Sequence, residues 1–382
     1  MFVKRWRICQ LFGIPVFIDA SWLVILSLLT FTMEANLQSI PALAGLSALS
    51  YWVMGAGTAL AFFACILLHE MGHALVAQST GQPVAGITLF LFGGVAEMKS
   101  EPTTALREFA MAIAGPLVTV VLALGFGLVY VLAQLYAWPA AVAVIAQYLL
   151  AINVVVLVFN MVPAFPLDGG RVLRSILWGA MGNLKRATRI ASVCGSAFAW
   201  FLIFAGLLSL FGGDPLQGIW LGLIGLFLNN AAQGSYRQVL LREALEGEPL
   251  ARFMTSQPIV VPPDLDLQHW VDDYVYRYHR KTFPVSSNGD LQGVVSTPAL
   301  AEIPRNEWHA HTVAEVMQHD FRDITIGPEA DAMAALQKMQ QTGSSRLLVT
   351  DRQAHLVGIV SLKDLMRFLS LKLELEEGND GD

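Results

Sequence analysis

Long stretches without charged side chains constrain this chain more than any other feature. No Asp, Glu, Lys or Arg occurs in residues 109–167, and Glu70 is the only one in residues 51–96. Residues 1–236 hold 18 of the 54 charged residues of the chain. A helix that spans a membrane needs about 20 mostly apolar residues. We therefore expect a membrane domain first and a soluble domain after it.

Six spans are predicted from the apolar runs, at residues 14–33, 51–76, 109–135, 140–162, 190–211 and 216–232. The apolar N-terminal stretch contains Asp19 and lacks a small-residue cleavage site, so we expect it to be retained as the first span. All ten Lys and Arg residues of the first 236 fall on one side of this topology. Positive residues mark the cytoplasmic side, so the N- and C-termini are expected in the cytoplasm.

The motif "HEMGH" places ionisable groups inside the second predicted span. His69 and His73 are four residues apart, so a helix presents both imidazoles on one face, about 6 Å apart along its axis. This geometry suits one tetrahedral zinc ion, and Glu70 could then activate water at the metal as a general base. The alternative is a solvated helix face. Burying three ionisable groups in a span without a partner costs several kcal/mol, which favours the metal site.

A catalytic zinc site needs a third protein ligand and an open position. Residues 1–236 contain only two histidines, so the third ligand is not a histidine. Asp168, in "PLDGGR", ends the longest charge-free run and lies at the cytoplasmic end of the fourth predicted span. It could instead cap or terminate that span, with Gly169 and Gly170 forming the turn. Gly115, which precedes a proline, indicates a kink or close helix packing.

The two motifs together resemble those of the site-2 protease family of intramembrane zinc metalloproteases. The second motif of that family has the form N-x-x-P-x-x-P-x-D-G, and "NMVPAFPLDGGR" matches it at Asn160, Pro163, Pro166, Asp168 and Gly169. The resemblance covers essentially the whole chain and is greatest to a branch with six spans and a C-terminal pair of CBS modules.

The resemblance assigns roles to the residues of both motifs. It implies that His69, His73 and Asp168 hold one Zn²⁺ per chain and that Glu70 activates water. The implied activity is endoproteolysis of transmembrane segments in membrane-tethered regulators, such as anti-sigma factors, in a prokaryotic plasma membrane. Asn160 could donate to the oxyanion or to an unwound substrate, or it could bond backbone groups freed near the prolines.

Residues 83–101, between the two motifs, alternate weakly and are rich in Ile, Leu, Phe and Val. Because a Gly-Gly pair interrupts them, we expect a strand or a hairpin folded back into the membrane, where its backbone must be buried by protein or line a wet cavity. An unwound substrate could pair with its edge at Phe92, Gly93, Gly94 and Val95. A loop at the membrane surface is the alternative.

An internal repeat occupies the soluble part, with copies that begin at Met254 and Met317. Both copies are predicted to run strand, helix, strand, strand, helix, and the pair resembles tandem CBS modules, which commonly bind adenine nucleotides. In "GIVSLKD" of the second copy, Ser361 could meet a phosphate and Asp364 a ribose hydroxyl. The first copy has Ala299 at the position of the acid. The pair therefore either binds ATP, ADP or AMP, or serves as a structural or dimerising unit.

The expected fold is a polytopic α-helical membrane protein with a membrane-inserted β-hairpin, followed by an α/β tandem CBS domain. The expected domains are a transmembrane metalloprotease domain, a linker, two CBS modules and an acidic disordered tail, at residues 1–236, 237–248, 249–312, 313–373 and 374–382. The net charge of −6 gives no indication of nucleic-acid binding. A CBS-gated transporter or channel is the alternative function, although the spans contain no inverted repeat.

Overall fold

The computed structural model describes residues 5–98, 102–287, 289–351, 353 and 355–377. The chain forms two compact units, Met1–Arg237 and Gln238–Asp382. Helix α7 (Pro215–Leu245) runs from the first unit into the second, so most of the segment predicted as a linker is helical.

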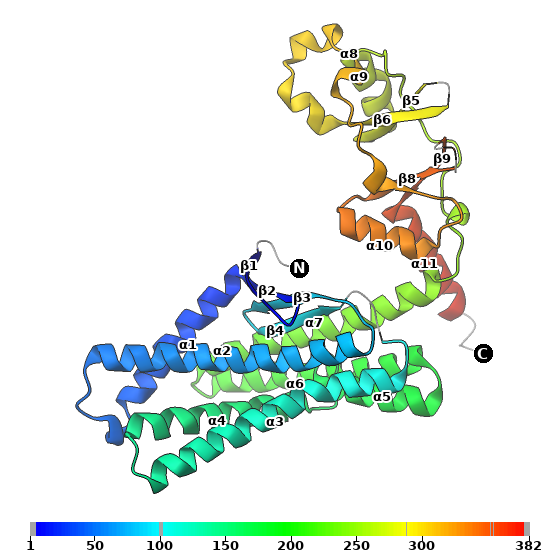
Figure 1. Cartoon of the computed structure of the whole chain (residues 1–382). Coiled ribbons are helices and arrows are strands. Elements are labelled where there is room, and N and C mark those ends of the chain that lie inside the picture. Colours follow the sequence, from blue (N-terminus) through cyan, green and yellow to red (C-terminus); the bar gives the residue numbers. More distant parts are fainter. Residues whose placement is uncertain (1–4, 99–101, 288, 352, 354, 378–382) are drawn as a thin grey trace. The chain divides into compact units, whose positions relative to one another are not determined.

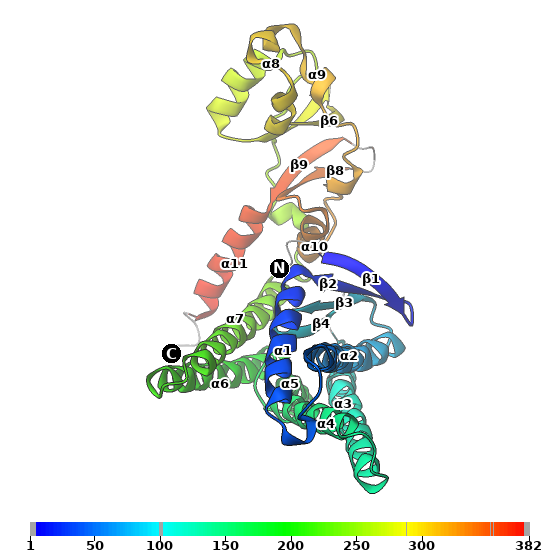
Figure 2. The same ribbon diagram turned by 90° about the vertical axis from the view of Figure 1, so that its left-hand side faces the viewer.

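The first unit is built mainly of helices, most of them long and apolar (Figures 1 and 2). They are α1 (Ala20–Gln38), α2 (Ala48–Ser79), α3 (Ala105–Leu135), α4 (Ala140–Asn160), α5 (Asp168–Met181), α6 (Leu184–Phe211) and most of α7. Among the described residues, α1, α2, α3, α4 and α6 are long and apolar enough to cross a membrane. Large apolar side chains such as Leu124 and Phe201 are exposed on the outside of these helices, as a lipid-facing surface requires.

Two of the six predicted spans differ from the structure. The start of the first span is wrong, because residues 14–19 form a strand and Asp19 is the N-cap of α1, where its carboxylate accepts a hydrogen bond from the Ser21 N–H. Asp is a favoured N-cap residue, which explains a charge at this place. The sixth predicted span lies within α7, which is not among the helices apolar enough to cross, so a count of six is not confirmed.

A four-stranded sheet lies beside α2 in both views (Figures 1 and 2). Its order is β1 (Arg5–Leu11), β2 (Ile14–Asp19), β3 (Val84–Phe90) and β4 (Gly93–Met98). The pair β3–β4 is the hairpin predicted within residues 83–101, of which 99–101 lie outside the described residues. The hairpin β1–β2 was not predicted, and its second strand pairs in parallel with β3. Ile14 and Ile87 of the sheet pack against Met71 and Ala74 of α2.

The second unit contains two α/β repeats with separate cores. Its elements are α8 (Leu267–His269), β5 (Thr282–Ser287), β6 (Asp290–Ser296), α9 (Val313–Val316), β7 (Thr325–Ile326), α10 (Ala332–Thr342), β8 (Arg346–Thr350), β9 (Leu356–Ser361) and α11 (Leu362–Glu377). Helix α8 continues as a π-helical turn, and the first repeat closes with short 3-10 helices where an α-helix was expected. Residues 374–377 are helical, which corrects the predicted start of the disordered tail.

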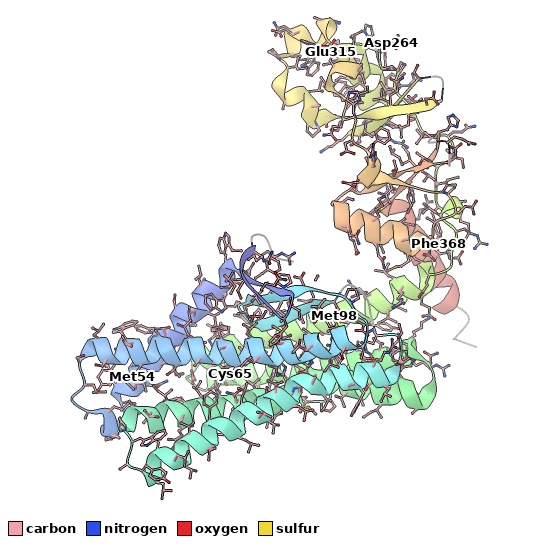
Figure 3. The ribbon with its side chains drawn as sticks, viewed as in Figure 1. Met54, Cys65, Met98, Asp264, Glu315 and Phe368 are labelled. Atoms are coloured by element: carbon pink, nitrogen blue, oxygen red, sulfur yellow. The ribbon has the colours of Figure 1, made fainter. Side chains whose placement is uncertain are left out.

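Each repeat takes the opening segment of the other into its core. Leu250 and Phe253 are buried in the cluster that contains Leu347 of the second repeat. Val313, from the opening segment of the second repeat, is buried in the cluster that contains Trp270 of the first repeat. The two repeats are thereby interlocked within one unit. All three cysteines of the chain are free, including the buried Cys65 on α2 (Figure 3).

Candidate metal centre

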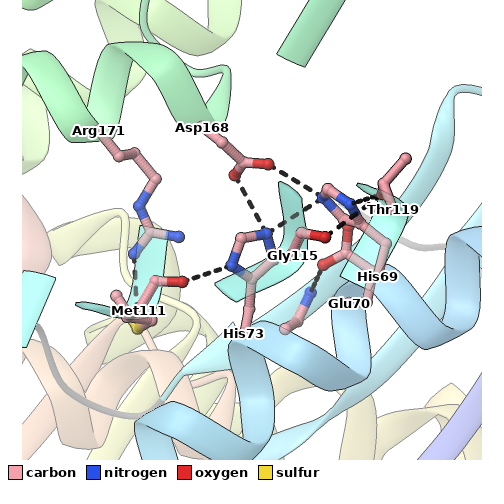
Figure 4. A network of polar contacts seen from close by, with 9 residues as sticks. His69, Glu70, His73, Met111, Gly115, Thr119, Asp168 and Arg171 are labelled. Carbon is pink, nitrogen blue, oxygen red and sulfur yellow. Dashed lines mark hydrogen bonds and ion pairs between the residues drawn. The ribbon is translucent and has the colours of Figure 1, made fainter. Parts of the chain in front are cut away.

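The two motif histidines lie one turn apart on α2. The helix begins at Ser47, whose side chain accepts a hydrogen bond from the Ser50 N–H, and continues through an apolar sequence that no proline interrupts. His69 and His73 are both buried, and their Nε2 atoms are 3.2 Å apart (Figure 4). The spacing of the motif therefore gives the predicted pair of neighbouring imidazoles.

Helix α3 orients both imidazoles through their Nδ1 atoms. The carbonyl oxygen of Met111 lies 2.7 Å from Nδ1 of His73, and Thr119 Oγ1 lies 2.8 Å from Nδ1 of His69. A carbonyl only accepts, so His73 carries its proton on Nδ1. The Thr119 hydroxyl donates its one proton to the Gly115 carbonyl at 3.3 Å, so it accepts from Nδ1 of His69, which therefore also carries its proton on Nδ1. Both Nε2 atoms then turn unprotonated lone pairs toward each other.

Asp168 completes the group from α5, of which it is the first residue. Its Oδ2 lies 3.0 Å from Nε2 of His69 and its Oδ1 lies 3.2 Å from Nε2 of His73. Leu167 is the N-cap of this helix, so the Asp168 side chain contacts the histidines and does not cap. Gly169 follows because a Cβ there would overlap the backbone of residues 161 and 162.

The donor set fits a cation. One atom each of His69, His73 and Asp168 lies within 4.8 Å of the other two, and all three present lone pairs. Such a group is repulsive unless a positive ion neutralises it, and two imidazoles with a carboxylate suit zinc. Gly115 of α3 keeps the space open, because a Cβ there would overlap Nε2 of His73 and lie 2.7 Å from Nε2 of His69.

Glu70 lies between this group and the sheet. It follows His69 on α2 and is half-buried beside the two imidazoles (Figure 4). Its Oε2 accepts a hydrogen bond of 3.1 Å from the backbone N–H of Ala96 in β4. A Cβ at Gly94 would lie only 2.7 Å from Cγ of Glu70, so the strand can approach α2 this closely only with glycine at that position.

Comparison with known proteins identifies the family. Residues 57–144 and 132–202 match the profile of peptidase family M50, and residues 250–303 and 313–371 match that of the CBS domain. The Synechocystis protein sll0528 is 34% identical over 95% of each chain. The chain belongs to peptidase family M50. The zinc metalloprotease MJ0392 of Methanocaldococcus jannaschii is 29% identical over 97% of each chain.

The M50 assignment confirms the resemblance to site-2 proteases, the fold class and the class of enzyme, a zinc metalloprotease. Among solved structures, the site-2 protease from Methanocaldococcus jannaschii has a TM-score of 0.42 and 27% sequence identity, and the match covers 60% of this chain and 94% of that one. The M50 profile falls on the spans that a transporter or channel would use, so that alternative is not carried further.

The segment predicted to bind substrate forms the tip and the beginning of the edge strand. Phe92 lies in the turn between β3 and β4, and Gly93, Gly94 and Val95 begin β4. The Phe92 ring stacks on Phe227 of α7 with 4.6 Å between centroids. Since β4 ends the strand order, its outer edge pairs with no strand of the described residues.

Asn160 is the last residue of α4 and is half-buried. Within the described part of the chain, no hydrogen bond joins its side chain to the two histidines, Glu70 or Asp168. The structure therefore brings four of the M50 site candidates together, and among the described residues Asn160 makes no hydrogen bond to them.

A buried ion pair fastens α5, the helix of Asp168, to α3. Arg174 Nε donates to Oε1 of Glu108 at 2.6 Å, and its Nη2 donates to the same oxygen. Glu108 is fully buried, and the Arg174 guanidinium lies 4.9 Å from the centroid of the Phe165 ring. Helix α3 thus supports each of the three candidate ligands, two through hydrogen bonds and the third through this ion pair.

Sequence reasoning missed most of this support. Thr119 and the Met111 carbonyl carry no motif that could have identified them. Gly115 was interpreted as a kink or a packing position, and the close packing is confirmed, since a Cβ at Gly72 on α2 would also lie 2.9 Å from Val118 on α3. The location of Gly115 against both imidazoles was not predicted.

The second unit of this M50 chain contains a cavity of ≈ 250 Å³ between the two repeats. Among the described residues, its lining includes three basic side chains, His279, Lys281 and Arg346, and no acidic one. Burial and, to a lesser extent, the neighbouring Arg280 lower the pKa of the Arg346 guanidinium. Ser361 and Asp364, the predicted nucleotide contacts, do not line the cavity, and the Asp364 carboxylate accepts a hydrogen bond of 3.0 Å from the Ser361 N–H.

Proposed function

We propose that this chain is an intramembrane zinc endopeptidase that hydrolyses peptide bonds in transmembrane segments of membrane-tethered regulatory proteins. The observation that carries the proposal is the convergence of two imidazole Nε2 atoms of α2, a helix apolar enough to cross a membrane, with the Asp168 carboxylate of α5, beside Glu70. His69, His73 and Asp168 would hold the zinc. When bound, the ion supplies Lewis acidity that acidifies water and polarises the scissile carbonyl.

The chain's own groups perform the proton transfers. The Glu70 carboxylate takes the proton of the attacking water and delivers it to the leaving amine. The Met111 carbonyl and the Thr119 hydroxyl hold both imidazoles in the tautomer whose Nε2 is free of a proton. Asn160 is proposed as a donor to the oxyanion or to the substrate backbone, on the strength of the motif alone.

The substrate is proposed to bind as a strand. A helix hides its carbonyls in internal hydrogen bonds, so a scissile bond must be unwound before attack. The outer edge of β4, including Gly93, Gly94 and Val95, offers backbone groups with which an unwound segment could pair next to Glu70. The positive-inside pattern of the six-span topology, with α7 as the sixth span, supports N- and C-termini in the cytoplasm of a prokaryotic cell and a site near that side.

We also propose that the CBS pair binds an adenine nucleotide or dimerises the protease. The cavity between the repeats supports the first option, because His279, Lys281 and Arg346 line it and would attract an anionic ligand. Phosphates would lie near His279, Lys281 and Arg346, in place of the contact predicted at Ser361. Calorimetric titration of the purified protein with ATP, ADP and AMP tests this, and the absence of heat with all three would favour the dimerising role.

Cleavage in reconstituted membranes tests the main proposal. Wild-type protein in liposomes is expected to cut a co-reconstituted model substrate whose transmembrane segment contains a central Gly-Pro. Glu70→Gln is expected to retain zinc and lose cleavage, because the amide takes no proton from water. Equal cleavage by both proteins would contradict the role of Glu70, and cleavage by protein stripped of zinc would contradict the metal mechanism.

A further inference from the structure

The backbone of β4 holds the proposed general base as well as forming an edge. The Ala96 N–H donates to Oε2 of Glu70 at 3.1 Å. Ala96 is paired opposite Ile87, and Gly94 opposite Leu89. Successive residues of an antiparallel strand alternate between bonding their partner strand and facing away from it. Because the Ala96 N–H faces Glu70, the N–H and C=O groups of Gly94 and Ala96 all face outward.

The contact is built into the packing of α2 under the sheet. The Ala96 side chain packs against the cluster of Met71 and Ala74, which lie on the same helix as Glu70. Two positions away, the missing Cβ of Gly94 leaves the room that the Glu70 side chain occupies. The Glu70 carboxylate therefore lies at the outer edge of β4, where it accepts a hydrogen bond from one backbone group, the Ala96 N–H.

That donor is also one that a substrate strand needs. If a substrate strand paired with the outer edge of β4, its carbonyl oxygens would accept hydrogen bonds from the outward N–H groups of Gly94 and Ala96. A backbone N–H has one proton to donate, so the Glu70 carboxylate and a substrate carbonyl compete for the Ala96 N–H.

We infer that the Ala96 N–H is a shared donor, which holds Glu70 in the substrate-free enzyme and releases it when an unwound segment pairs with β4. This inference rests on the proposed function and adds a source of specificity to it. The carbonyls of an intact helix are already bonded and cannot displace Glu70. Only an extended segment both reaches the edge and frees the base.

Peptide binding to inactive variants tests the competition without depending on turnover. The probe is a fluorescein-labelled peptide of about 20 Leu and Ala residues with a central Asn-Gly-Pro to favour unwinding. Glu70→Gln keeps an oxygen that can accept from the Ala96 N–H, whereas Glu70→Met has a similar shape and only a weakly accepting sulfur. The peptide is expected to bind the Met variant about fivefold more tightly, the size expected for one hydrogen bond.

Ala96→Pro supplies the matched control. Proline has no N–H to donate. Because the Ala96 N–H faces away from β3, its removal leaves the hydrogen bonds between β3 and β4 intact. In this background the Gln and Met variants are expected to bind equally, with thermal unfolding in detergent verifying the fold. Three results would each overturn the inference. The Gln and Met variants could bind the peptide equally without the proline, or neither could bind it, or their difference could persist in the Ala96→Pro background. Cleavage by wild type together with such a result would reject the shared donor and leave the protease function standing.

Discussion

Gly115 lies so close to His73 that a Cβ at position 115 would overlap the histidine's Nε2. The space between the two imidazoles therefore depends on one glycine of α3. Gly115→Ala is expected to abolish zinc binding while the helices remain folded, because the methyl group would crowd the Nε2 atoms of both histidines that would hold the ion. Metal content per chain by mass spectrometry checks this. Gly125→Ala on the same helix, where a Cβ meets nothing within 4 Å, should keep full zinc content. Full zinc in Gly115→Ala would contradict this assignment.

Thr119→Val is expected to weaken zinc binding about 10- to 100-fold, the usual effect of removing a group that orients a metal-bound histidine. The valine has the shape of threonine and cannot accept the hydrogen bond of 2.8 Å from His69. Competition with a fluorescent chelator measures the affinity. Thr119→Ser, which keeps the hydroxyl, should bind zinc like the wild type, and equal affinities for Val and Ser would show that the hydroxyl has no such role.

Glu108→Ala is expected to destabilise the fold by about 3 kcal/mol, because it leaves the Arg174 charge buried without its partner. Unfolding in detergent, followed by circular dichroism, measures the loss. Glu108→Leu combined with Arg174→Leu removes both charges and should cost less than the single change. A single variant as stable as wild type would mean that the ion pair does not fasten α5.

Arg346→Ala is expected to weaken ATP binding about tenfold or more, because it removes the charge-assisted hydrogen bond that we propose Arg346 makes to a phosphate in the cavity between the repeats. Isothermal titration measures the change. Arg322→Ala is the control, since Arg322 is exposed and does not line the cavity. Similar losses in both variants would indicate a general charge effect and contradict a phosphate contact at Arg346.

The sequence allowed prediction of residues whose chemistry is carried by spacing. His69 and His73 are one helical turn apart, and an otherwise charge-free span makes them conspicuous. Asp168 could be identified because it ends the longest uncharged run. No such signal marks Thr119, which looks like any other threonine in an apolar helix, or the Met111 carbonyl, which every residue has. Those contacts depend on how α3 crosses α2.

The errors have equally local causes. Strand β2 and helix α1 are both apolar and adjacent, and hydrophobicity alone does not separate a short strand from the start of a helix, so Asp19 was placed inside a span. The hairpin was recognised from its Gly-Gly break, whereas its place at the edge of a four-stranded sheet depends on pairing between β2 and β3. The nucleotide contacts assigned by motif to Ser361 and Asp364 stay predictions, and in this structure the Asp364 carboxylate accepts a hydrogen bond from the Ser361 N–H.

Zinc analysis of three purified proteins tests the central claim most directly. Wild type and Glu70→Gln are expected to contain one zinc ion per chain, because Glu70 is not among the three converging ligands. Asp168→Ala is expected to contain none after dialysis against a weak chelator, because two imidazoles alone do not hold the ion tightly. Folded wild-type protein without zinc, or equal zinc in wild type and Asp168→Ala, would contradict the account.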